Sequence, residues 1–178
     1  MKKLKMAIIF HDFGKLIIKR IDRNGVCTFP GHETASGFGV YEYMRVMRYN
    51  DIDRYQVALA VMLHHHPMNL EKRLEFVKSE FGNRRIGKEH FHKFFGEMEG
   101  VIDNNMKMTE EQIDKVFKDG GTVSVSDAVY LAVQIFREGW IKVWMNSGKK
   151  ERRVLLLLIQ GVVASDYFSA REREGGTG

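Results

Sequence analysis

The stretch VALAVMLHHHP at residues 57–67 carries the strongest structural signal in this 178-residue chain. An apolar run of this length is typical of a buried helix. Three histidines follow it directly, at 64–66, and packing in an apolar core does not explain such a triplet. Pro67 predicts the end of the helix, because the residue before a proline is pushed out of the α region. We therefore expect a buried helix over 52–65, with Asp51 as its N-cap, that presents imidazoles at its C-terminal end.

Helical patterning recurs along most of the chain. It predicts further helices over 3–18, 33–48, 69–81, 87–103, a segment opened by the capping box of Thr109 and Gln112, 123–146 and 150–172. Residues 20–33 are expected to form a loop, because Asn24-Gly25 and Pro30-Gly31 mark turns. The chain is predicted to be all-α, with a single compact domain over 1–172 and a disordered tail at 173–178.

Composition narrows the class of protein. A net charge of +5 and a pI of about 9.3 favour an anionic partner such as nucleic acid. One cysteine, Cys27, excludes an internal disulfide and suits a cytoplasmic location. No P-loop pattern is present, so we expect no ATPase. The apolar run at 154–164 is too short to span a bilayer, and we expect it to form a buried helix without membrane contact.

Two short segments before residue 40 carry candidate metal ligands. The first is Phe10-His11-Asp12-Phe13-Gly14-Lys15, in which His11 and Asp12 are adjacent and Lys15 lies on the same face of the expected helix. Gly14 would let another part of the backbone approach closely. The second is Gly31-His32-Glu33, with Ser36 one helical turn after His32. Imidazole and carboxylate groups are the ligands that hold divalent transition metals.

Late in the chain, Asp166 lies among apolar residues of the last expected helix. A carboxylate buried there requires a partner, which is either a metal ion or a basic side chain. Of the histidine triplet, His64 and His65 are the predicted ligands. The role of His66 stays open, because Pro67 displaces it from helical geometry.

Together, His11-Asp12-x-Gly-Lys15, Gly31-His32-Glu33-x-x-Ser36, His64-His65 and Asp166 resemble the HD superfamily of metal-dependent phosphohydrolases. They resemble most closely the HD nuclease of type I CRISPR interference, made as a stand-alone subunit in many archaea. The resemblance spans the chain from His11 to Asp166. It implies an HD-type helical domain that hydrolyses phosphodiester bonds of single-stranded DNA, as an endonuclease or exonuclease, in antiviral defence.

The resemblance also implies roles for individual residues. Asp12 would bridge two divalent ions, which could be Mn, Mg, Ni, Co or Fe. His11 and Asp166 would complete the first site, and His32, His64 and His65 would form the second. Lys15 would act with Asp12 in catalysis, near the scissile phosphate. Ser36 would hold the metal ligands in place as a hydrogen-bond donor. The implied partners are a separate CRISPR helicase subunit and the RNA-guided surveillance complex.

One departure from the family and two alternative functions stay open. Family members usually carry a further ligand histidine on an earlier helix, and none of the ten residues before His11 is a histidine. Water, another subunit or an upstream segment would have to fill that position. The first alternative is an HD phosphohydrolase acting on nucleotides or cyclic nucleotides. The second is a non-enzymatic docking subunit of a nucleic-acid complex.

Overall fold

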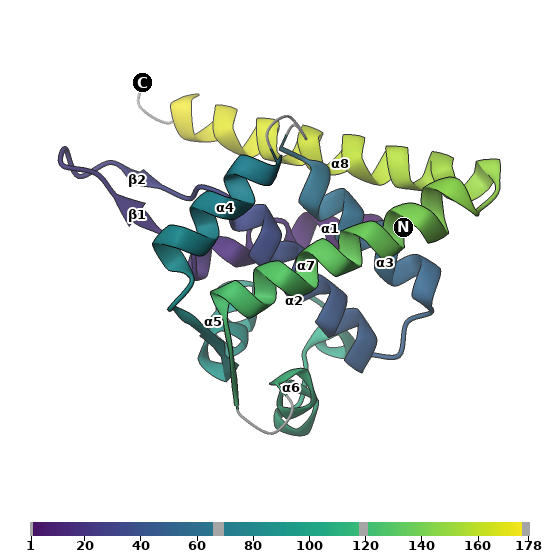
Figure 1. The fold of residues 1–178 in the computed structure, drawn as a ribbon, viewed down its shortest axis with the longest axis horizontal. Helices are drawn as coiled ribbons and strands as arrows, with labels where there is room; N and C mark the ends of the chain where they lie inside the picture. Colours follow the sequence, from purple (N-terminus) through teal and green to yellow (C-terminus); the bar gives the residue numbers. More distant parts are fainter. Residues whose placement is uncertain (1, 66–69, 118–120, 176–178) are drawn as a thin grey trace.

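The computed structural model describes residues 2–65, 70–117 and 121–175. Helices dominate these ranges, so the predicted all-α class is confirmed (Figure 1). The α-helices are α1 (Lys2–Phe10), α2 (His32–Val46), α3 (Asp51–Leu63), α4 (Leu70–Phe81), α5 (Lys88–Glu97), α6 (Glu110–Phe117), α7 (Val125–Gly139) and α8 (Lys149–Gly175). Short helical turns add η1 (Phe13–Leu16), η2 (Asn104–Met106) and the π-helical η4 (Trp140–Met145).

Two short antiparallel ribbons interrupt the helices. Strands β1 (Arg20–Ile21) and β2 (Cys27–Thr28) form a hairpin within the segment that we expected to be a loop. Strands β3 (Arg85–Gly87) and β4 (Thr122–Ser124) pair across a long sequence separation. None of these strands was predicted, because two or three residues are too few to show the alternation that identifies a strand.

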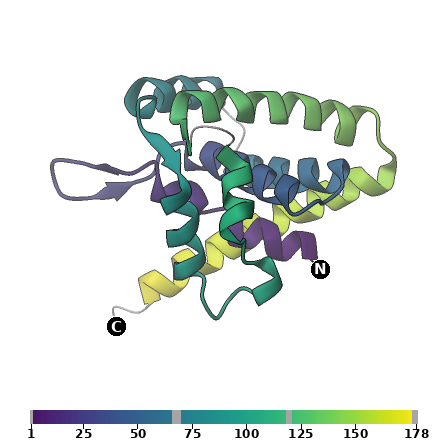
Figure 2. The same ribbon diagram turned by 90° about the horizontal axis from the view of Figure 1, so that it is seen from below.

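The core forms around α2 and α3, which pack against each other and against α7. Gly37 permits this approach, because a Cβ there would collide with the side chain of Met62. Helix α3 also packs on α8, which runs across most of the molecule in both views (Figures 1 and 2). The ends of α1 and α3, the start of α2 and the middle of α8 thereby share one region, where the predicted ligands lie.

Several helix boundaries differ from those predicted. Helix α3 is capped by Asn50, whose side chain accepts a hydrogen bond from the Asp53 amide, and not by Asp51. The predicted helix over 87–103 ends at Glu97, and the one over 123–146 changes to π-helical geometry at Trp140. Helix α8 continues to Gly175, three residues beyond its expected end. The capping box of Thr109 and Gln112 is present as expected.

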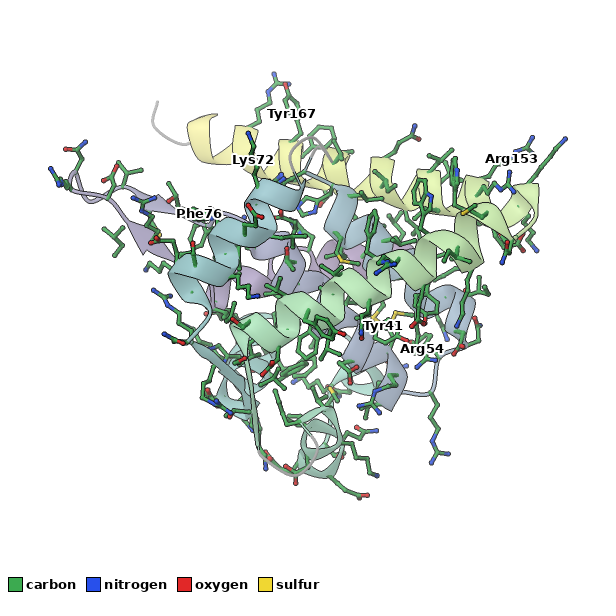
Figure 3. All side chains as sticks on the ribbon, in the orientation of Figure 1. Tyr41, Arg54, Lys72, Phe76, Arg153 and Tyr167 are labelled. Atoms are coloured by element: carbon green, nitrogen blue, oxygen red, sulfur yellow. The ribbon has the colours of Figure 1, made fainter. Side chains whose placement is uncertain are left out.

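The expectation of a buried helix over 154–164 holds for one face only. Leu155, Leu158 and Val162 are buried, whereas Leu157 and Val163 on the opposite face are exposed. The exposed apolar character continues at Tyr167, which points away from the body in Figure 3. Within the described ranges, no helix combines the length and apolar character that a bilayer span requires.

Candidate metal centre

The His-Asp pair lies in a turn and not inside a helix. Helix α1 ends at Phe10, although patterning predicted a helix to residue 18. The Gly14 amide donates to the Ser36 hydroxyl, 2.7 Å away, in place of the carbonyl that would continue the helix. Gly14 has to lack a side chain, because a Cβ would collide with the carbonyl oxygen of His32. Ser36 and Gly14 thus hold the turn against the start of α2.

The second segment is also fixed by a glycine. Gly31 precedes α2 with a φ of 74°, in the left-handed region that favours glycine. A Cβ at this position would collide with the side chain of Val77 on α4. This close approach places His32, the first residue of α2, between the His-Asp turn and the end of α3.

Three histidines share one arrangement. The Nδ1 atoms of His11, His32 and His64 lie 2.6, 2.8 and 2.5 Å from the backbone carbonyl oxygens three residues earlier. A carbonyl only accepts hydrogen bonds, so each Nδ1 carries a proton, and in the neutral ring Nε2 then keeps its lone pair. The three Nε2 atoms are buried without a hydrogen-bond partner. A buried, unpaired lone pair is costly in a folded protein, and a metal ion would satisfy it.

The predicted ligands gather into two groups. His32, His64 and His65 offer ligand atoms that lie within 4.8 Å of one another, and His11, Asp12 and Asp166 do the same. Asp12 connects the groups, because its Oδ1 lies 3.4 Å from His11 Nε2 and 3.5 Å from His32 Nε2. Asp166 reaches the site from α8, with Oδ1 3.8 Å from His11 Nε2. These histidine and aspartate groups, of which His11, His32 and His64 are buried, can hold a metal ion.

The electrostatics favour an ionised Asp12. Burial alone would raise the pKa of this carboxyl, but the adjacent His32, Lys15 and His11 side chains outweigh burial and hold the pKa well below its usual range. The Lys15 ammonium lies 2.7 and 2.8 Å from the two Asp12 oxygens. Asp12 is therefore a carboxylate at neutral pH, which is the form that binds cations.

The histidines at the end of α3 are held neutral. Burial, together with the nearby His65, lowers the pKa of His64 to about 3. Burial and the nearby His32 lower the pKa of His65 to about 4. Both rings are therefore uncharged at neutral pH, as metal ligation requires.

A buried ion pair lies behind the ligands. Glu33 is 0% exposed, and its Oε1 lies 2.5 Å from an Arg73 guanidinium nitrogen on α4. The same guanidinium donates to the carbonyl oxygen of His65, 3.4 Å away. Arg73 thus joins the start of α2 to the end of α3. Sequence reasoning assigned Glu33 no role and missed Arg73. The only available signal was a glutamate at the first turn of a buried helix.

The structure places each predicted site residue as follows. His11, Asp12, His32, His64, His65, Asp166 and Lys15 converge on one region, and Ser36 lies beneath the His-Asp turn. The side chain of Asp166 is 29% exposed, so this carboxylate is only partly buried. His66 lies outside the described residues. That these groups bind ions stays a prediction.

Comparison with known proteins supports the family resemblance that the motifs indicated. No protein-family profile matches the chain. No solved structure matches it. The chain is 26% identical over 177 residues to the CRISPR-associated endonuclease Cas3-HD of Pyrococcus furiosus, in an alignment that covers 98% of this chain and 73% of the relative. The resemblance to the HD nucleases of type I CRISPR systems, indicated by the sequence motifs, is thereby confirmed.

Proposed function

We propose that this chain is a metal-dependent nuclease that hydrolyses phosphodiester bonds of single-stranded DNA in CRISPR antiviral defence. The observation that carries the proposal is the set of buried, unpaired Nε2 atoms of His11, His32 and His64 around the Asp12 carboxylate. The similarity to a protein named as a CRISPR-associated endonuclease supports it. A separate helicase subunit and the RNA-guided surveillance complex would supply unwound DNA, because this chain has no P-loop motif.

The residues divide into two sets of ligands. His11, Asp12 and Asp166 would hold one divalent ion, and His32, His64 and His65 would hold a second. Ions bound there would supply Lewis-acid polarisation of the phosphodiester and a water nucleophile that ionises near neutral pH. The backbone carbonyls that accept hydrogen bonds from Nδ1 orient the imidazoles of His11, His32 and His64. Burial keeps the rings of His64 and His65 uncharged.

Lys15 has a distinct role in this proposal. Its ammonium lies against Asp12 and is within reach of an anion at the same place. It would offset the charge that develops on the non-bridging phosphate oxygens. The proposed contacts of the ions and of Lys15 are all with the phosphate and none is with a base, so cleavage should depend little on the DNA sequence.

The direct test is incubation with Mn²⁺ and three kinds of substrate: circular single-stranded DNA, duplex DNA, and a panel of nucleotides and cyclic nucleotides. We expect the circular single strand to be cut. Asp12→Asn should abolish cutting, and Asp114→Asn, which changes an exposed carboxylate on α6, should not. Release of phosphate from nucleotides without cut DNA would replace the proposal by a nucleotide hydrolase. Activity that survives Asp12→Asn would contradict the assigned site.

A further inference from the structure

An open groove of about 300 Å³ lies beside the metal centre, between the turn before α2 and the exposed side of α4. It is lined by Pro30, Gly31, Lys72, Arg73 and Phe76. Its volume is at the lower end of the range for small-molecule sites, about 300–1,000 Å³. The motifs that identify the metal centre include none of the three α4 residues.

The groove adjoins the ligands through two of its lining residues. Gly31 is bonded to His32, and Arg73 contacts both Glu33 and the carbonyl oxygen of His65. A chain that leaves the His32–His65 side of the metal centre can therefore enter this groove. The guanidinium of Arg73 is paired with buried Glu33, so the ligand preference of the groove depends on its other groups.

Those groups are a free cation and an aromatic ring. Lys72 is exposed and has no ion-pair partner among the described residues. Phe76 follows one helical turn later on the same face of α4, on the side towards the β1–β2 hairpin (Figure 3). The Arg20 guanidinium of β1 lies over the Phe76 ring, 5.9 Å from its centroid. Positive charge next to an aromatic face is the combination that binds single-stranded nucleic acid.

We propose that this groove is a nucleotide subsite, in which Lys72 pairs with a backbone phosphate and Phe76 stacks on a base of the strand held at the metal centre. The inference rests on the proposed function and adds the path of the strand along α4. Arg20 supplies a second cation from the hairpin. Stacking accepts every base, so the subsite holds the strand without reading its sequence.

The test measures binding and not cleavage. Affinity for a fluorescent oligothymidylate is measured in EDTA over a range of salt concentrations, for the wild-type chain, Lys72→Gln, Phe76→Leu and Phe76→Trp. Lys115→Gln is the control, because it removes another exposed lysine charge, which lies on α6 and is paired with Glu111. Thermal melts accompany each variant, since Phe76 is partly buried against the core.

We expect Lys72→Gln to reduce the slope of log affinity against log salt by about 0.7, the value for one phosphate contact on a single strand. Phe76→Leu should weaken binding roughly fivefold or more, and Phe76→Trp should restore it. Lys115→Gln should leave the slope as in the wild type. If the wild type binds and cuts single-stranded DNA and the α4 variants bind it with the same affinity and salt slope, the subsite is refuted. The proposed nuclease function is then unaffected. If the wild type neither binds nor cuts single-stranded DNA, the proposed function fails and the subsite fails with it.

Discussion

The buried ion pair of Glu33 and Arg73 makes the sharpest mutational prediction. Arg73→Met removes the cation and keeps much of the side-chain volume. Glu33, at 0% exposed, is then left as a charge without a partner. Breaking a buried pair in this way costs about 3–5 kcal/mol. Arg73 is 29% exposed, so water reaches this region and we expect the lower end, about 3 kcal/mol.

The ranking of the variants by free energy of unfolding distinguishes loss of the ion pair from simple loss of packing. Glu33→Gln leaves a half-exposed guanidinium that water can solvate, so it should destabilise the chain less than Arg73→Met does. The double variant Glu33→Gln/Arg73→Met should also be more stable than Arg73→Met alone, because it leaves no unpaired buried charge. Urea unfolding of the metal-free chain measures the three differences in free energy.

The same variants test the link to the metal centre. Arg73 contacts the His65 carbonyl as well as Glu33, so Arg73→Met should loosen both histidine segments. We expect weaker Mn²⁺ binding by calorimetry, within the 10- to 100-fold range that holds when groups supporting metal ligands are lost. A loss of stability below about 1 kcal/mol for Arg73→Met, or a double variant less stable than it, would refute the reasoning.

Three further predictions follow from the same region. Gly14→Ala should destabilise the chain by about 1–3 kcal/mol in urea melts, because its methyl group would collide with the His32 carbonyl; wild-type stability would contradict the turn geometry. Ser36→Ala leaves the buried Gly14 amide unpaired and should cost about 1–3 kcal/mol, whereas an exposed hydroxyl such as Ser79 can be replaced by alanine with little effect. The pKa values of His64 and His65 fall from 6.5 in the unfolded chain to about 3 and about 4, so the unfolded state binds more protons in between. Stability of the metal-free chain should be complete above pH 6.5 and decline as the pH falls towards 4, and thermal melts that do not change over this range would contradict the burial of these rings.

The helices follow from local sequence patterns, whereas a shared site for the ligands was implied by the resemblance to the HD superfamily. An apolar run that ends in histidines specifies both a buried helix and the position of its polar end, as α3 shows. Gly14 also has the role expected of it, because another part of the backbone, the His32 carbonyl, lies close to it. Local pattern was sufficient wherever the deciding residues lie within a few turns of each other.

Features that depend on distant partners were not predictable in this way. The end of α1 at Phe10 depends on a hydroxyl from Ser36, and nothing near residue 10 signals it. The pair of Glu33 and Arg73 joins residues forty positions apart, and pairing of β3 with β4 spans a similar separation. The mixed exposure of α8 was missed because a stretch that is apolar on nearly every side gives little information about which face is covered.

The central claim is that His11, Asp12 and Asp166 hold one divalent ion and that His32, His64 and His65 hold another. Anomalous scattering from crystals soaked in Mn²⁺ tests it most directly, because the peaks count the ions and identify their ligands together. We predict two peaks, one within each group, and the loss of the peak at His11 and Asp166 in crystals of Asp12→Asn. A manganese-soaked crystal with no peak at these residues, or with peaks only elsewhere on the surface, would contradict the account.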